Sequence, residues 1–320
     1  MIVYAFHGQI VHSAIALPDL PIRAAGERPE PFSSARSITA TAQHPPSPIT
    51  IRRVGPESLR LLPVPEYDIQ VDDQDRVLFL IPEGAVITLH PHGLIEVATT
   101  AAMPEDLLCH VLIGQVLPNA LVDRGMTPLH ASAVRCGSRV WCFVGDSGLG
   151  KSTMAAAFLA QGSDVLCDDV TPLSWQNEHP WCHPGPGRLK LWPDVIAALQ
   201  LSRRKRRPIH GQHLKSVVDA SSGLSQPQAI SRIFHLVESP DGIIRSTTLT
   251  GPDAVPLLYS NIFGHRRTST SARAEHFART TRVAMSGRLA QLAIPRSLER
   301  LPEVMAYLAA QPEPERSSER

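Results

Sequence analysis

Long apolar runs are missing from this sequence. No window reaches the roughly 18–20 consecutive apolar residues that a membrane-spanning helix needs. The first residues also lack a basic leader followed by an unbroken apolar stretch. The sequence therefore predicts neither a membrane span nor a secretory signal, and we expect a cytoplasmic protein.

Paired cysteines and an excess of one charge are missing as well. None of the five cysteines belongs to a C-x-x-C pair, so a disulfide framework or a cysteine zinc site is disfavoured and a reducing compartment fits best. Histidine spacings typical of zinc sites are also absent. The 31 Lys and Arg residues balance 30 Asp and Glu residues, so net charge gives no argument for a nucleic acid or another polyanion as partner.

The first hundred residues have the pattern of a β-rich domain. Residues 4–17 alternate like a strand, and residues 26–48, rich in Pro and Ser, predict a loop. Short apolar runs then alternate with turn-forming residues, which is typical of a β meander. These runs are residues 49–51, 69–71, 77–80, 85–89 and 94–98.

A helix is expected next, over residues 104–124. Pro104, Glu105 and Asp106 suit a first helical turn, Gly125 suits the end, and Pro118 is expected to kink or end the first stretch. We therefore predict a β-rich N-terminal domain with a Pro/Ser-rich loop (1–103), a linking helix (104–126), an α/β domain (127–310) and a disordered tail (311–320).

The second domain has α/β texture. Strands are expected at residues 131–134 and 140–144, a helix at 151–160 and a strand at 164–167. Further along, residues 230–237 and 243–249 resemble a hairpin that turns at residues 239–242. The remaining expected elements are helices at 254–263, 277–288 and 298–310 and a strand at 291–294.

A glycine-rich loop lies between the strand 140–144 and the helix 151–160. It fits the P-loop pattern G-x-x-x-x-G-K-[ST] in its required context, with an apolar strand before it and a helix after it. The glycines let backbone N–H groups approach phosphate oxygens, and the helix N-terminus attracts the same anion. The candidate nucleotide-binding residues are Gly145, Asp146, Ser147, Gly148, Leu149, Gly150, Lys151, Ser152 and Thr153.

This pattern predicts binding of a nucleoside triphosphate, most simply ATP, together with Mg²⁺. Lys151 can bridge the outer phosphates, and the Ser152 hydroxyl can ligate the metal. Asp168 and Asp169 end the next strand, where a P-loop fold places carboxylates toward the phosphates. One carboxylate can serve the metal while the other accepts a proton from an attacking hydroxyl.

These residues resemble a known family. Leu129-His130-Ala131-Ser132, the loop 145–152 and Cys167-Asp168-Asp169-Val170 are similar to the catalytic domain of bacterial HPr serine kinase/phosphorylase. Residues 4–20, 189–193 and 294–296 resemble its subgroup in lasso-peptide gene clusters, which phosphorylates a serine of a precursor peptide. The family usually has Gly where this chain has Ala131.

The resemblance implies a fold and a set of roles. The fold would be α/β, with a P-loop kinase core like the C-terminal domain of HPr kinase and a small β-rich N-terminal domain. Lys151 would bind the β- and γ-phosphates, Asp168 would act as base, His130 would tune or relay the proton, and Ser152 and Asp169 would hold Mg²⁺. HPr kinases are commonly hexameric, so a homo-oligomer is one expectation.

Several other residues keep two interpretations. The basic run 203–207 is either a solvated loop or a loop that attracts an acidic peptide or a phosphate. Arg188 and Lys215 are candidates for stabilising a transferring phosphoryl group. Trp192 either packs in the core, the preferred interpretation, or lines a substrate groove.

Three functions stay open on the sequence alone. The first is a kinase that transfers the γ-phosphoryl of ATP to a serine of a protein or peptide, such as a lasso-peptide precursor or HPr. The second is a small-molecule kinase or plain NTPase, although the GTPase N-K-x-D and the ABC-type L-S-G-G-Q patterns are absent. The third is a nucleotide-binding regulator that transfers nothing.

Overall fold

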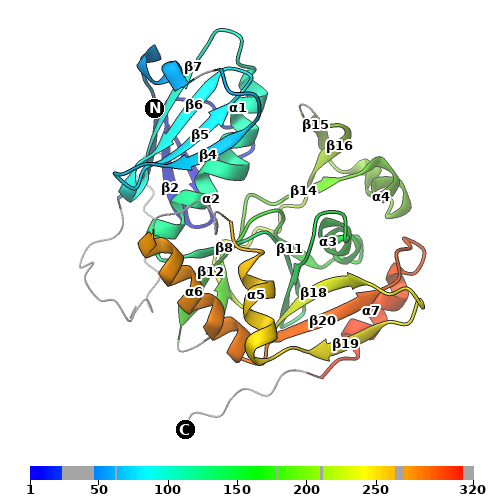
Figure 1. Ribbon diagram of the computed structural model, residues 1–320. Helices are drawn as coiled ribbons and strands as arrows, with labels where there is room; N and C mark the ends of the chain where they lie inside the picture. Colours follow the sequence, from blue (N-terminus) through cyan, green and yellow to red (C-terminus); the bar gives the residue numbers. More distant parts are fainter. Residues whose placement is uncertain (24–46, 62, 177–178, 210–211, 264–269, 313–320) are drawn as a thin grey trace.

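The computed structural model describes residues 1–23, 47–61, 63–176, 179–209, 212–263 and 270–312. Figure 1 shows two β-rich parts, with the N-terminal sheet at the upper left and the larger mixed α/β part below it. Among the described residues, no helix has the length and apolar character needed to cross a membrane. The expected loop at 26–48 and most of the expected tail at 311–320 lie outside the described residues.

The N-terminal part is built on a seven-stranded sheet in the order β1-β2-β3-β7-β6-β5-β4. The expected meander is confirmed for β4 to β7, which pair antiparallel in sequence order. Residues 49–51 were expected in it as well, but they form β3, which joins β7 in parallel. Residues 4–17 form not one strand but the hairpin β1–β2, because His7 and Gly8 take positive φ and turn the chain. The strands are β1 (Ile2–Phe6), β2 (Gln9–Ser13), β3 (Ile49–Arg53), β4 (Asp68–Val71), β5 (Val77–Ile81), β6 (Ala85–Leu89) and β7 (Leu94–Thr99).

The helical segment that follows packs against this sheet. It runs through α1 (Glu105–Val111), a π turn η3 (Leu112–Val116), α2 (Leu117–Ala120) and the short turn η4 (Val122–Arg124). Pro118 sits in the first turn of α2, where its missing N–H does least harm, and Gly125 ends the segment with φ +75°. Its buried side chains, including Leu112 and Leu117, share one apolar cluster with the sheet. The division into domains at 103 and 126 stays a prediction.

A six-stranded sheet with the order β11-β9-β10-β18-β20-β19 forms the centre of the second part. β10, β18 and β20 run parallel, and β11 runs the same way on the far side of the antiparallel β9. The carboxyl ends of four strands therefore lie at the same edge of the sheet, namely those of β10, β11, β18 and β20. The start of β9 lies at this edge too. The strands are β9 (Ser132–Cys136), β10 (Arg139–Val144), β11 (Asp164–Cys167), β18 (Arg232–Glu238), β19 (Arg245–Thr248) and β20 (Leu289–Ile294).

The expected hairpin between residues 230–237 and 243–249 is wrong. Both segments are strands, β18 and β19, but they do not pair with each other. β20 lies between them, parallel to β18 and antiparallel to β19. The reason is burial: β20 supplies fully buried Leu289, Ala290 and Leu292 to the centre of the sheet, whereas β19 is polar and suits the edge.

Helices cover this sheet, and two smaller sheets flank it (Figure 1). The expected helix 151–160 and strand 164–167 are confirmed with those bounds, while the later helices differ in their ends. The helices are α3 (Lys151–Ala160), α4 (Pro193–Ala198), α5 (Ala254–Tyr259), α6 (Thr270–Met285) and α7 (Leu301–Ala309). One flanking sheet has β8 (Thr127–Leu129), β12 (Thr171–Gln176), β13 (His179–Cys182) and β17 (Gln228–Ala229); the other has β14 (Arg188–Leu191), β15 (Arg206–Ile209) and β16 (Gln212–Asp219).

Candidate functional site

The glycine loop joins β10 to α3 at the shared edge of the six-stranded sheet. Gly145 has φ +138°, and a Cβ there would lie 3.0 Å from the carbonyl oxygen of Leu236, so any other residue would be strained and crowded. Gly150 has φ +92° immediately before the first residue of α3. The loop thus turns tightly and ends at a helix N-terminus, where backbone N–H groups without intrahelical partners can bind an anion.

Lys151 folds back over this loop. Its ammonium donates to the carbonyl oxygens of Gly145 at 2.7 Å and of Asp146 at 3.1 Å. Burial lowers the pKa of Lys151, and the nearby carboxylates of Asp168 and Asp169 oppose that shift. The amine is therefore partly dehydrated, and an added anion at the loop would gain a close, poorly solvated cation.

Asp168 is the centre of a hydrogen-bond network. Its Oδ1 accepts from the hydroxyl of Ser132 at 2.6 Å and from the hydroxyl of Ser152 at 2.8 Å, while its Oδ2 accepts from the backbone N–H of Lys190 at 3.0 Å. These donors come from β9, α3 and β14. The carboxylate is consequently held in one orientation against the first turn of α3.

Asp169 faces a different set of partners. Its Oδ2 accepts from the Lys190 ammonium at 2.5 Å, and its Oδ1 lies 3.4 Å from Nδ1 of His130. Burial alone would raise the pKa of Asp169, but the His130 ring and the Lys190 ammonium hold it well below its usual range. Asp169 also has φ +72°, a left-handed conformation that aspartate tolerates and that often occurs at functional sites.

His130 is positioned by its backbone contacts. Its Nδ1 lies 3.1 Å from the carbonyl oxygen of Asp169. Because a carbonyl can only accept, Nδ1 is the donor in this contact, and in a neutral ring Nε2 is the acceptor. The side chain is 40% exposed, so a substrate can reach the ring.

The sequence-predicted residues Lys151, Ser152, Asp168, Asp169 and His130 therefore lie around one point. The contacts favour a division of labour between the two aspartates that differs from the expected one. Ser152 contacts Asp168, not Asp169, and these two oxygens are the hard donors that Mg²⁺ prefers. In the part of the chain that is described, no group of three or more His, Cys, Asp or Glu side chains could hold a metal ion by itself.

Three further residues of the site were given no role from the sequence, although Ser132 and Lys190 lie in segments that carry the family resemblance. Ser132 and Lys190 reach the aspartates only because β9 and β14 are brought to β11 by the fold. Asn261 follows α5; its side chain accepts from the N–H of Gly145 at 3.1 Å, and its carbonyl accepts from the N–H of His130 at 2.7 Å. Asn261 thereby connects the loop to the histidine. Gly145 and Asn261 are 116 positions apart in the sequence.

The other basic candidates have partners of their own. Arg188 forms an ion pair with Asp19 at 2.7 Å, and Arg207, from the basic run 203–207, pairs with the same carboxylate. The ammonium of Lys215 lies 5.0 Å from the centre of the Trp192 ring. Core packing of Trp192 was the wrong expectation: the residue stands between β14 and α4, is 46% exposed and lines a cavity.

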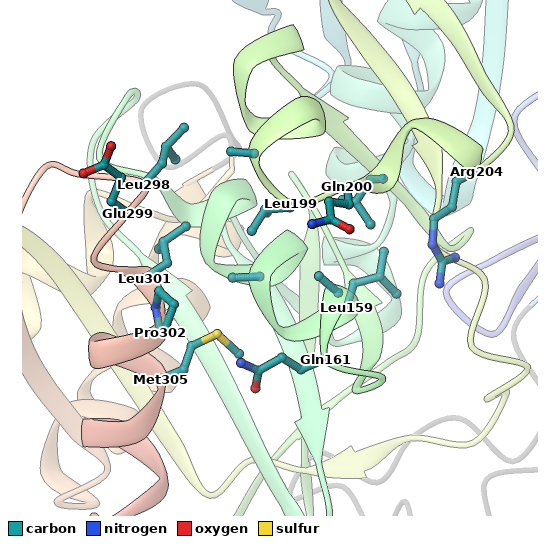
Figure 2. Close-up of a pocket in the computed structure, with 14 residues that line it drawn as sticks. Leu159, Gln161, Leu199, Gln200, Arg204, Leu298, Glu299, Leu301, Pro302 and Met305 are labelled. Carbon is teal, nitrogen blue, oxygen red and sulfur yellow. The ribbon is translucent and has the colours of Figure 1, made fainter.

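Two neighbouring cavities lie along one face of α3, and Leu298 and Leu301 line both of them. The first, of about 770 Å³, is lined in part by Gly148, Gly150 and Thr153 of the loop and its helix. The second, of about 840 Å³, is lined by Leu159 and Gln161 near the other end of α3, with Leu199 and Met305 across from them (Figure 2). Only the first adjoins the glycine loop.

Comparisons with known proteins do not identify a family for this chain. No protein-family model matches the chain, and no curated protein matches it. A solved structure, the Hpr(Ser) kinase/phosphatase from Coxiella burnetii, is similar at 13% sequence identity with a TM-score of 0.30, covering 57% of this chain and 93% of that chain. A similarity this low carries no argument about function, which must come from the geometry.

Proposed function

We propose that this protein is a kinase that binds Mg²⁺ and ATP and transfers the γ-phosphoryl group to a serine hydroxyl of a protein or peptide. One observation carries the proposal: the Ser152 hydroxyl lies 2.8 Å from the Asp168 carboxylate at the end of a glycine loop that closes on Lys151. A P-loop hydroxyl beside a strand-end aspartate is the pair that holds Mg²⁺ in P-loop enzymes.

The phosphates would be held by the loop and by Lys151. Backbone N–H groups of the loop and of the first turn of α3 face the anion, and Lys151 moves from the carbonyls of Gly145 and Asp146 to the outer phosphates. When bound, Mg²⁺ neutralises charge on the phosphate oxygens. Ser152 and Asp168 would hold it, directly or through water.

The acceptor hydroxyl would lie on the His130 side of the site. In the transfer, the serine oxygen forms a bond to the γ-phosphorus as the bond from that phosphorus to the β,γ-bridging oxygen breaks, and ADP leaves. The serine proton goes to Nε2 of His130, whose ring is held by the carbonyl of Asp169. Asp168, engaged by three donors, is assigned to the metal in place of the base role that the family resemblance implies.

The acceptor is proposed to be a peptide because the chain resembles the subgroup of kinases from lasso-peptide gene clusters. HPr is the alternative acceptor. The first test is whether ATP turnover depends on the acceptor. ADP release should be slow with protein alone and should rise at least tenfold when a lasso-type precursor peptide or HPr is added. Fast release that no acceptor changes would make the protein an NTPase instead, and tight ATP binding without any turnover would favour a nucleotide-binding regulator.

A further inference from the structure

The cavity of about 770 Å³ beside the glycine loop has no role in the transfer described above. Its floor is the loop and the first turn of α3, through Gly148, Gly150 and Thr153. Its walls are the segment 192–195 and residues 294–298, which follow β20. None of the residues that surround the transferred phosphoryl, Lys151, Asp168 and His130, lines it.

The topology of the sheet places this cavity at an edge where ligands commonly bind. The loop follows β10, Glu238 ends β18 and Ile294 ends β20, and these three strands are parallel neighbours. Ligands of open sheets with parallel strands bind outside the carboxyl ends of the strands. The cavity therefore occupies the edge of the sheet where a ligand is expected, next to the anion site.

The order of residues along α3 indicates which end of a bound nucleotide would enter the cavity. Lys151 and Ser152 belong to the end where the outer phosphates would be held, and Thr153, the next residue, already lines the cavity. A triphosphate lying along this turn would extend its inner end past Thr153 into the cavity. A volume of about 770 Å³ is ample for a base and a ribose.

Trp192 is the unusual wall residue. Tryptophan is normally well buried, yet this side chain is 46% exposed. It stands at the cavity between β14 and α4, and the Lys215 ammonium lies over its ring at 5.0 Å. An exposed indole plane beside a phosphate site is suited to stacking on a nucleobase.

We propose that this cavity binds the nucleoside part of the nucleotide and that Trp192 stacks on its base. The inference rests on the proposed function, because the outer phosphates fix which end of the ligand enters the cavity. Trp192 is thus a binding residue for the base, whereas the loop and Lys151 bind the phosphates.

The test compares ATP with inorganic tripolyphosphate, which lacks the nucleoside. Calorimetric titrations in Mg²⁺ use the wild type, Trp192→Ala, Trp192→Phe and Lys151→Ala. We expect Trp192→Ala to weaken ATP binding about tenfold and to leave tripolyphosphate binding unchanged, whereas Trp192→Phe keeps most of the ATP affinity. Lys151→Ala should weaken both ligands.

A fluorescence titration gives an independent result. ATP should quench the wild-type tryptophan emission and should quench Trp192→Phe much less, although Trp141, Trp175 and Trp181 remain. Equal ATP affinity in wild type and Trp192→Ala would overturn the cavity assignment and leave the kinase proposal standing. ATP binding that depends on Trp192, without transfer to any acceptor, would support the cavity and count against the kinase.

Discussion

At the scale of single residues, the site is a set of charged side chains, each held in place by more than one contact. Asp168 has three donors, Asp169 has the Lys190 ammonium and the His130 ring, and Lys151 has two loop carbonyls. Phosphoryl transfer asks a protein mainly for positioning and charge stabilisation. Each of these residues can therefore be tested alone.

Lys151→Ala should lower kcat for phosphoryl transfer by about 100-fold or more, because it removes the cation nearest the transferred group. The fold should survive, since Lys151 contacts loop carbonyls instead of apolar side chains. Steady-state kinetics and thermal melting measure both effects. Arg245→Ala, at an exposed cation on the edge strand β19, is the control; a Lys151 variant as active as this control would contradict the site assignment.

His130→Gln should lower kcat by about 100-fold, because the proton acceptor is lost, and should leave the Mg²⁺ requirement unchanged. Asp168→Asn should instead raise the Mg²⁺ concentration needed for half-maximal activity. Rate measurements across Mg²⁺ concentrations separate the two roles. A Mg²⁺ requirement that rises in His130→Gln, or one that stays unchanged in Asp168→Asn, would contradict this division of roles.

At the scale of elements, the local sequence pattern predicted those helices and strands that depend on neighbouring residues. The glycine loop, α3 and β11 follow from residues adjacent in sequence, so the sequence predicted them. Pairing of β18 with β20 depends on a strand about 50 residues away, which explains why the expected β18–β19 hairpin was wrong. The roles of Lys190, Ser132 and Asn261 were missed for the same reason, since only the assembled topology brings the first two to the aspartates and Asn261 to Gly145.

Leu292→Ala, in the middle of β20, should destabilise the α/β part by about 2–5 kcal/mol. Leu292 is fully buried in the cluster that includes Phe234 and residues of α3 and α7, so its truncation leaves a cavity there. Denaturant unfolding followed by tryptophan fluorescence measures the change. Gln291→Ala, on the same strand and only half-buried, should change the midpoint little; equal effects would argue against β20 as a central strand.

At the scale of the whole molecule, the N-terminal part touches the strands that carry the site. His7, after β1, makes a 3.0 Å hydrogen bond through Nδ1 with the carbonyl oxygen of His183, after β13. Asp19 reaches Arg188 on β14. The sequence suggested a separate β-rich part but gave no sign of these contacts, because single polar residues far apart carry no pattern.

Stability should fall between pH 7 and pH 4 partly because of His183. Burial, with a smaller contribution from His7, lowers the pKa of His183 to about 4. Between that value and the ordinary histidine value the unfolded chain binds the extra proton, so His183 favours unfolding as pH falls, by at most about 3 kcal/mol. His183→Gln should weaken this pH dependence in denaturant titrations, and His12→Gln is the control. An unchanged slope in His183→Gln would contradict the assignment.

The most direct test of the kinase proposal is mass spectrometry of candidate acceptors after incubation with Mg²⁺ and ATP. We predict that a lasso-type precursor peptide gains one phosphate on a serine with the wild type, gains almost none with Lys151→Ala, and gains much less with Asp168→Asn at the same Mg²⁺ concentration. Phosphate on HPr instead would keep the kinase and change its acceptor. An acceptor that is modified equally by wild type and both variants, or ATP binding with no modified acceptor, would contradict the account.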